Sequence, residues 1–426
     1  MKRGLVKLAL SSGAAVMPTF ACAQSVGVGS VIVIEPDLDR NDVAGGRLEP
    51  DYSPRPVVVG PLLAEPSVSM VGGFQTNLFN RPDAQAAASA TVNPALKLRT
   101  NASRHELRFS AMGALRRYSR YTTENSEQYT LEAGGRFDLG ARQAIRLSAQ
   151  YAQLIEPRSS VGSVPDAAEP VSFRRLSADV GAGFAFGAFR VVPRLRYEQL
   201  DYNAVDRTGG GSADQSFRDT RTVGGELRLE YEFSGLLSGF AAASYDDVAS
   251  TSAPAALQRD SRDYTVVAGL RGELSPVISG EASIGYRSRD YDQPAYRDFS
   301  GVTFRADLQW YVTPLLTLRA QARRDFRNSG ARTVGGILTD TITLSAYYDP
   351  LRNWRLALDA GLERGDFGDV DTRTWCKSFR LRAQYRLNRS LSIGAYLGVL
   401  RQDVSGAPLV NPFTSFSAGL GVTITP

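Results

Sequence analysis

Histidine and cysteine are almost absent from this chain of 426 residues. It has one histidine, His105, and two cysteines, Cys22 and Cys376. Two cysteines exclude a disulfide-rich scaffold, and so small a set of nitrogen and sulfur ligands cannot build a usual zinc site. No convincing set of a histidine with a serine or an acid is present either. We therefore expect no metal, no cofactor and no enzymatic activity.

Long apolar runs are absent beyond the first residues of the chain. No stretch of 18 or more apolar residues follows residue 23, which excludes a bundle of membrane-spanning helices. The chain starts with Lys2 and Arg3, continues with an apolar segment over 5–20 and reaches the small residues Ala21 and Ala23. These features predict a signal peptide over 1–23, so the mature protein is expected to leave the cytoplasm.

Lysine is also rare, although the chain is basic. Of 49 basic residues only Lys2, Lys7, Lys97 and Lys377 are lysine, and the rest are arginine. Arginine stays charged in any surroundings and forms planar, two-point hydrogen bonds with carboxylates and phosphates. Arginine is therefore the general cationic residue of this protein.

Prolines are concentrated after the expected cleavage site. Residues 24–65 contain five of them, with Gly45-Gly46 and several acids, and one more follows at Pro66. This density argues against helix or strand and predicts an extended, proline-rich periplasmic linker over 24–65, ahead of a barrel over 66–426. We expect a flexible tether below the membrane rather than a plug.

Alternation of apolar and polar residues dominates the remainder of the chain. In the segment 264–287, apolar Val266, Ala268 and Leu270 alternate with polar or small residues up to a turn at Ser275-Pro276, and the pattern then resumes. This period of two predicts a hairpin with one apolar and one polar face. Each arm has roughly 11 residues, the length of a tilted strand that crosses a bilayer.

Eighteen such segments can be counted, and their connections alternate between short and long. The segments are 67–80, 87–99, 105–118, 127–139, 143–155, 173–186, 188–202, 219–233, 236–246, 262–274, 277–289, 298–312, 315–327, 335–348, 352–364, 374–387, 390–402 and 413–425. This alternation of short and long connections is typical of an outer-membrane barrel, which has tight periplasmic turns and long outer loops.

Aromatic residues support the same fold. Phe233 and Trp310 lie beside short turns, whereas Tyr202, Tyr264 and Trp375 lie beside long ones, as two interfacial girdles require. A large soluble all-β protein would explain the periodicity alone, but not the sorted loops and the signal peptide. The sequence thus predicts an all-β, transmembrane, up-and-down antiparallel β-barrel of about 18 strands in the outer membrane of a Gram-negative bacterium.

The polar phase of the strands is expected to line an aqueous lumen, because a barrel of this size is too wide for side chains to fill. Ion pairs between neighbouring strands can brace such a wall, whereas an excess of arginine can favour anions or sugar-rich solutes. For each single residue bracing is the expected role, and the sequence does not show which arginines are left unpaired. The predicted lumen-lining residues are Arg108, Glu132, Arg136, Arg146, Arg194, Arg196, Glu226, Arg228, Arg271, Glu273, Arg305, Asp307, Arg319, Arg355, Arg380 and Arg382.

The chain also resembles a family, the putative beta-barrel porin 2 group of proteobacterial outer-membrane proteins. The resemblance is carried by the proline-rich lead 47–66, by segments 73–79 and 104–107, by the hairpin 269–287 and by segment 385–392. It implies an association with exopolysaccharide secretion, with a polysaccharide export lipoprotein and an acidic polysaccharide as partners. The chain ends in Ile424-Thr425-Pro426 rather than in an aromatic residue, so the barrel-assembly machinery is expected to recognise Phe413 or Phe416.

The predicted function is passage of a hydrophilic polymer, an exopolysaccharide, through an arginine-rich lumen. Two alternatives stay open at this point, a general or anion-preferring diffusion porin and a structural or adhesive barrel that presents its loops. The expected partners include outer-membrane lipid and exclude nucleic acid.

Overall fold

The computed structural model describes residues 32–34, 38–40, 43–140, 142–164, 166–407 and 409–426. The expected signal peptide over 1–23 lies outside these ranges. Within them, helix is confined to single turns, η1 (Thr122–Glu124), η2 (Ser216–Arg218) and η3 (Ala255–Leu257). No helix in the described ranges is long and apolar enough to cross a membrane.

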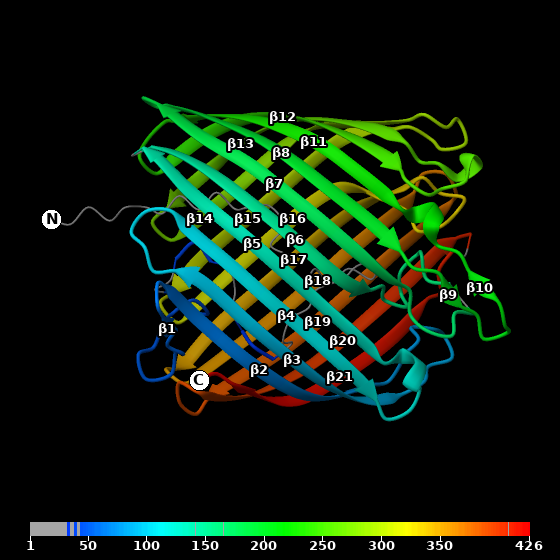
Figure 1. Ribbon diagram of the computed structural model, residues 1–426, viewed down its shortest axis with the longest axis horizontal. Helices are drawn as coiled ribbons and strands as arrows, with labels where there is room; N and C mark the ends of the chain where they lie inside the picture. Colours follow the sequence, from blue (N-terminus) through cyan, green and yellow to red (C-terminus); the bar gives the residue numbers. More distant parts are fainter. Residues whose placement is uncertain (1–31, 35–37, 41–42, 141, 165, 408) are drawn as a thin grey trace.

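Antiparallel strands form nearly the whole molecule (Figure 1). The main sheet has 19 strands in the described residues, and all except β1 close into a barrel of 18 strands. The predicted fold class is therefore confirmed. The strands are β1 (Val57–Val59), β2 (Leu62–Gln75), β3 (Ala87–Thr100), β4 (Glu106–Tyr118), β5 (Ser126–Gly140), β6 (Gln143–Ile155), β7 (Ser172–Phe186), β8 (Phe189–Tyr202), β9 (Val205–Asp206), β10 (Ser212–Ala213), β11 (Thr220–Glu232), β12 (Leu237–Ser250), β13 (Ser261–Ser275), β14 (Ile278–Tyr291), β15 (Phe299–Thr313), β16 (Leu316–Asn328), β17 (Gly336–Leu351), β18 (Trp354–Phe367), β19 (Thr372–Arg386), β20 (Leu391–Gly406) and β21 (Phe413–Ile424).

Barrel strands pair with their neighbours in chain order. The exception is β8, which pairs with β11 because β9 and β10 form a separate small hairpin. The last strand closes the cylinder by pairing with the first, with Val68 opposite Ile424 and Gln75 opposite Ser417. Closure matters because the lipid interior offers no hydrogen-bond partner to a free sheet edge.

The two ends of the barrel differ in their connections (Figure 1). Tight turns such as 187–188 and 276–277 lie at one end, together with the C-terminus, whereas 156–171 and 203–219 extend from the other. Short turns mark the periplasmic end of an outer-membrane barrel and long loops its extracellular end. We use these two names for the ends below.

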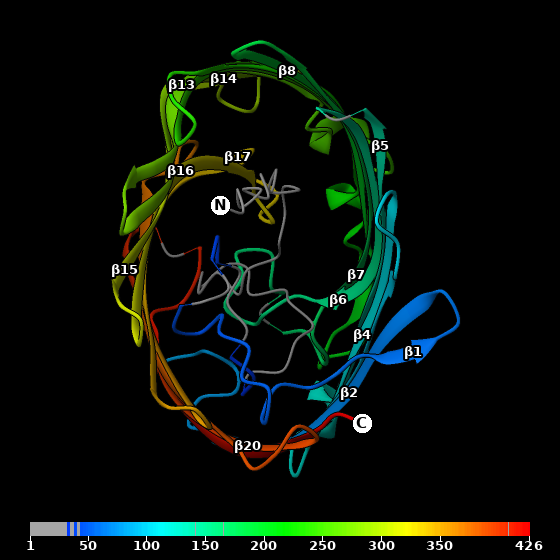
Figure 2. The same ribbon diagram turned by 90° about the vertical axis from the view of Figure 1, so that its left-hand side faces the viewer.

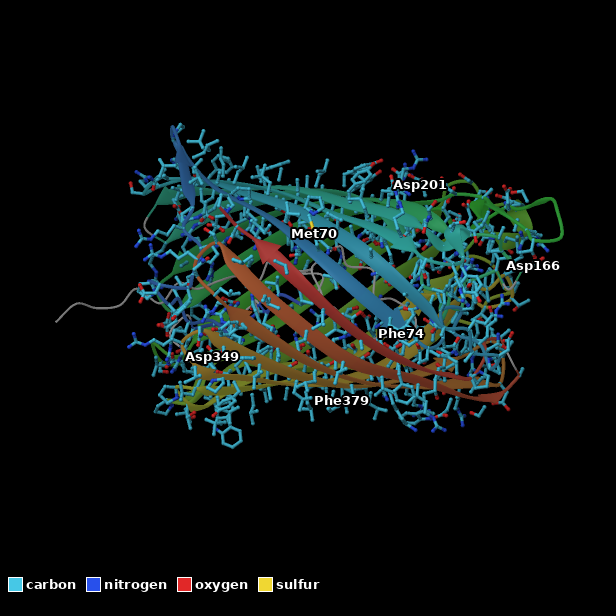
Figure 3. The ribbon with its side chains drawn as sticks, turned by 90° about the horizontal axis from the view of Figure 1, so that it is seen from below. Met70, Phe74, Asp166, Asp201, Asp349 and Phe379 are labelled. Carbon is cyan, nitrogen blue, oxygen red and sulfur yellow. The ribbon has the colours of Figure 1, made fainter. Side chains whose placement is uncertain are left out.

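Side chains alternate between the two surfaces of the wall, as the period of two predicts. Ile284 on β14 is 63% exposed on the outside, and Met70, Phe74 and Phe379 also lie on the outer surface (Figure 3). Polar residues such as Glu281, also on β14, take the alternate, inward positions. The outer phase therefore offers an apolar surface to lipid and the inner phase a polar one to water.

The first barrel strand starts earlier than the sequence predicts. Strand β2 begins at Leu62 rather than near residue 67, and β1 folds back on it through Gly60, whose φ of +57° favours glycine. Residues 57–65, which we assigned to the linker, thus join the sheet. Pro66 lies opposite Leu96 on β3, but pairing with β21 starts only at Val68. This part of β2 is thus an edge on its β21 side, where a proline is tolerated.

Candidate functional site

The structure places all the predicted lumen residues on the inward phase of the wall. On β11, for example, Leu227 and Leu229 are exposed outside, and Glu226 and Arg228 occupy the alternate positions. The same relation holds on β4 to β8, on β13, on β15 and β16, and on β18 and β19. The inner wall is consequently rich in arginine from end to end.

Many inward arginines brace the wall through carboxylates on neighbouring strands. Arg194 lies 2.5 Å from Asp179, Arg382 lies 2.9 Å from Asp359, and two Arg319 nitrogens contact Asp307 at 2.5 and 2.8 Å. Such two-point contacts fix both side chains and tie adjacent strands together. The further predicted residues Arg196, Arg228 and Arg271 also pair with carboxylates. Arg196 pairs with Asp246 on β12, Arg228 pairs with Glu230 on its own strand and with Glu281 on β14, and Arg271 lies 3.8 Å from Glu281.

Sequence reasoning missed several of these partners. Asp263 on β13 receives hydrogen bonds from both Arg287 and Arg289 on β14 and is almost fully buried. Glu281 likewise receives two hydrogen bonds of 3.0 Å from Arg228. Alternation assigns these residues to the inner face, but only the register between strands shows which cation meets which carboxylate.

Two inward arginine pairs do not follow this pattern. Arg136 on β5 is the cross-strand neighbour of Arg146 on β6, and Arg305 on β15 is the neighbour of Arg323 on β16. Arg136 contacts Asp138 at 2.8 Å. No hydrogen bond or ion pair is formed by Arg146, Arg305 or Arg323 within the described residues.

These two arginine pairs lie on opposite sides of the cylinder. In the view along the barrel, β5 and β6 are on one wall, and β15 and β16 are on the facing wall (Figure 2). Like charges directly opposite on adjacent strands destabilise a sheet. The inner wall therefore holds surplus positive charge on both sides of the lumen.

At the periplasmic end a segment of the chain before the barrel lies inside the lumen (Figure 2). We call its described residues, 32–34, 38–40 and 43–49, the luminal strap. Ile32 and Ile34 are 1% and 0% exposed, and the Ile34 N–H donates to Gln384 Oε1 on β19 at 3.3 Å. The sequence predicted a tether below the membrane here, whereas the strap packs against the inner wall.

Contacts from several strands hold the luminal strap. Arg355 on β18 and Arg382 on β19 donate to the carbonyl oxygens of Ile34 and Val33 at 3.2 and 3.3 Å. The Asp39 N–H donates to Gln309 at 2.9 Å, and the Gly45 N–H donates to Asp349 at 3.0 Å. Asp349 lies at the periplasmic end of the barrel, as Figure 3 shows.

A salt bridge also connects the strap to β13, on a part of the inner wall away from β18 and β19. Arg40 lies 3.2 Å from Glu273 on β13, and its guanidinium stacks over the Tyr311 ring with 4.6 Å to the centroid. Ile32 also lies beside Gly394 on β20 and Gly421 on β21, so the contacts of the strap run from β13 to β21. The position of the strap inside the lumen could not be predicted from its proline-rich sequence. The strap has no periodicity of its own and is held in place by contacts with the barrel strands.

The extracellular end is narrowed by loops that turn inward. Arg218, in η2, makes a buried pair with Glu156 at 2.5 and 2.8 Å and stacks over Tyr202 with 3.9 Å to the centroid. Burial opposes the charge of Arg218, but the carboxylate of Glu156 more than offsets it, so the pKa of Arg218 is raised. This pair joins the connection 156–171 to the connection 203–219.

A third loop meets the first two at this place. Gly330 approaches so closely that a Cβ added to it would lie 2.3 Å from Gly162 Cα. Arg259 donates to the Ser329 and Ala331 carbonyl oxygens and stacks over Phe217 with 5.5 Å to the centroid. We call the contacts among 156–162, 216–218 and 329–331 the extracellular latch.

The described residues contain one histidine and no cluster of the usual metal ligands. His105, the only histidine, has a φ of 60° beside a short periplasmic connection, and its Nδ1 accepts the Asp138 N–H at 3.2 Å. No group of three or more histidine, cysteine or acidic side chains in the described ranges could hold a metal ion. The arrangement instead supports the passage or binding of a polar solute.

Comparisons with known proteins agree with this arrangement. A family model described as Putative beta-barrel porin 2 matches residues 49–425. The copper transporter OprC is similar in structure, with a TM-score of 0.50 and 11% identity over 87% of this chain and 82% of OprC. A comparison with curated proteins gives no match.

Two receptors of known structure match with lower TM-scores. The siderophore receptor PiuA from Acinetobacter baumannii has a TM-score of 0.46 and 11% identity over 87% of this chain and 82% of that one. The ferric enterobactin receptor PfeA from Pseudomonas aeruginosa has a TM-score of 0.46 and 8% identity, over 85% and 81%. At these identities and TM-scores the two matches support no inference about this chain.

Proposed function

Because this chain belongs to the Putative beta-barrel porin 2 family, we propose that it is a gated channel that passes an acidic exopolysaccharide across the outer membrane. The protein is an outer-membrane β-barrel with a porin- or transporter-like fold. The lumen supplies the polar path, and the luminal strap and the extracellular latch control the two ends.

The two arginine pairs carry this proposal. Arg136 and Arg305 are exposed to the lumen, and each stands opposite a second arginine on the neighbouring strand. Carboxylates on a passing polymer would neutralise this surplus charge through two-point hydrogen bonds. Facing walls of the lumen offer such contacts at once, which suits a chain with repeated acidic groups.

The segments inside the lumen favour a polymer exporter over an open pore. A barrel of 18 strands is wide enough for an aqueous channel, yet the strap lies in it at the periplasmic end and the latch at the extracellular end. We propose that the strap closes the periplasmic entrance and that the latch narrows the extracellular exit. We propose that a periplasmic partner, such as a polysaccharide export lipoprotein, displaces the strap and delivers the polymer.

Deletion of the protein from its bacterium tests this function. We expect loss of surface acidic polysaccharide, restored by the wild-type chain and restored only weakly by the double variant Arg305→Gln, Arg323→Gln. The matched control is Arg324→Gln, since Arg324 pairs with Asp340 on the outer face. Unchanged surface polysaccharide in the deletion strain would refute the proposal.

An anion-preferring diffusion porin is the second candidate, because the same arginine pairs would also favour small anions. The two functions differ in how the purified protein conducts. A porin gives a steady open current in a planar bilayer, whereas a gated exporter stays closed until the strap is removed.

A further inference from the structure

The outer surface carries a basic patch where β18, β19 and β20 approach the extracellular end. The basic and acidic side chains of this patch point outward from their strands. Exposed apolar side chains lie on the same face, closer to the middle of the barrel. The patch consists of Arg364, Asp366, Arg373, Lys377, Arg401 and Asp403.

One half of the patch is built on Asp403. Its two carboxylate oxygens accept hydrogen bonds from Lys377 Nζ at 3.0 Å and from Arg401 Nε at 2.9 Å. Lys377 and Arg401 are also direct cross-strand neighbours, and their side chains are 57% and 60% exposed. One carboxylate therefore serves two exposed cations.

In the other half of the patch, Asp366 likewise accepts hydrogen bonds from two basic residues. Its Oδ2 accepts hydrogen bonds from Arg364 Nη2 at 3.2 Å and from Arg373 Nε at 3.3 Å. Arg364 lies over the ring of Trp375, with 5.9 Å to the centroid. Again two cations share one carboxylate, so the whole patch has a surplus of two positive charges.

Other exposed ion pairs near this end are balanced. Arg117 pairs with Glu127 on β4 and β5, and Arg262 pairs with Asp292 beside β13, in each case one cation with one carboxylate. In contrast to these two balanced pairs, the patch on β18 to β20 has a surplus of positive charge.

The depth of the patch in the membrane can be inferred from the apolar side chains that lie next to it, towards the periplasmic end. Next to Lys377 on the same face of β19 come Phe379 and Leu381, which are 46% and 42% exposed, and Leu397 on β20 is 59% exposed. Figure 3 shows Phe379 on the outer surface. The patch thus begins where the apolar belt ends, at the headgroup level of the outer leaflet, with Trp375 as an interfacial aromatic.

We propose that this patch binds the phosphate groups of lipid A, the anionic glycolipid of the outer leaflet. A phosphate between Lys377 and Arg401 would relieve the repulsion between these neighbours, and the guanidinium groups of Arg364 and Arg373 bind phosphate through two-point hydrogen bonds. The acyl chains of the same lipid would cover Phe379, Leu381 and Leu397. Clusters of basic residues beside an apolar surface recognise anionic headgroups in this way.

Native mass spectrometry of the purified full-length protein tests this site. The probes are diphosphoryl lipid A, dephosphorylated lipid A and inorganic phosphate, each titrated in a zwitterionic detergent. We expect the wild type to retain diphosphoryl lipid A and the double variant Lys377→Gln, Arg401→Gln to bind it about tenfold more weakly. The matched control Arg117→Gln, at an equally exposed but balanced pair, keeps wild-type binding.

Each outcome is decisive because folding is checked separately by heat-modifiable migration on gels. Equal binding of diphosphoryl and dephosphorylated lipid A, or equal binding by wild type and Lys377→Gln, Arg401→Gln, overturns the proposal. Inorganic phosphate that competes fully at the same concentration overturns the assignment to a lipid. A variant that fails to fold is replaced by Arg364→Gln, Arg373→Gln, for which the same weakening is expected.

Discussion

Arg305 on β15 and Arg323 on β16 are direct cross-strand neighbours on the inner wall, and neither has a carboxylate or hydrogen-bond partner within the described residues. Two like charges in this arrangement oppose folding of the sheet. Under the function proposed above, an anionic solute would pass between them and the arginine pair on the facing wall and would neutralise this charge.

Removal of this repulsion should stabilise the barrel and weaken its selectivity. The double variant Arg305→Gln, Arg323→Gln should gain roughly 0.2–1 kcal/mol in the free energy of unfolding, because two glutamines in these positions do not repel each other. Urea unfolding in lipid vesicles measures this gain. Arg319→Gln is the control, since loss of its pairing with Asp307 should destabilise the wall; loss of stability in both variants would contradict the account.

The luminal strap should become mobile when its contacts to the wall are removed. Arg355 donates to the Ile34 carbonyl oxygen, so Arg355→Ala should raise the hydrogen-exchange rate of peptides that cover 32–49. We expect an increase of about tenfold, equivalent to roughly 1.4 kcal/mol, with the exchange of the barrel strands unchanged. Arg305→Ala, which removes an inward arginine away from the strap, is the control. Rapid exchange of 32–49 already in the wild type would show that the strap is not held in the lumen.

The extracellular latch should depend on one buried ion pair. Arg218 and Glu156 have side chains only 6% and 8% exposed, and Glu156→Gln leaves the Arg218 charge without its partner. Loss of one member of such a pair costs about 3–5 kcal/mol, so the connections 156–164 and 203–219 should open locally. Limited proteolysis of these loops measures the opening. Arg117→Gln, at an exposed pair, should leave the loops resistant, and resistance of Glu156→Gln would argue against a latch.

Two adjacent residues of β14 should differ strongly in the cost of the same substitution. Ile284 faces lipid and is 63% exposed on the outside, whereas Ser283 faces the lumen. Ile284→Arg should cost about 2–4 kcal/mol, because it places a charge near the middle of the bilayer. Ser283→Arg should cost only roughly 0.2–1 kcal/mol, from repulsion by its cross-strand neighbour Arg305 on β15. Unfolding in lipid vesicles compares the two. Equal costs would mean that the inner wall is not water-filled.

Sequence periodicity was sufficient to predict the wall of the barrel, because a residue two positions along a strand always returns to the same face. Most strand limits agree within a few residues, as for β6 at Gln143–Ile155. The start of β2 at Leu62 was missed because Pro61 and Pro66 suggest a linker, and only the absence of β21 beside Pro66 makes a strand possible there.

Features that depend on distant contacts could not be predicted from the pattern. The luminal strap has no periodicity of its own, and Ile34 is positioned by Gln384 and Arg355, which are more than 300 residues away in the chain. The latch likewise depends on Gly162 and Gly330, which come together only when two loops turn inward. Alternation also does not determine which arginines lack carboxylates, since this follows from the register of neighbouring strands.

Single-channel recording in a planar bilayer is the most direct test of a gated channel for an acidic polymer. We predict that the wild type is closed, that deletion of 32–49 gives a stable open current, and that acidic oligosaccharides block this current while neutral ones of equal length do not. A wild type that conducts steadily, or a deletion variant that both oligosaccharides block equally, would contradict the account.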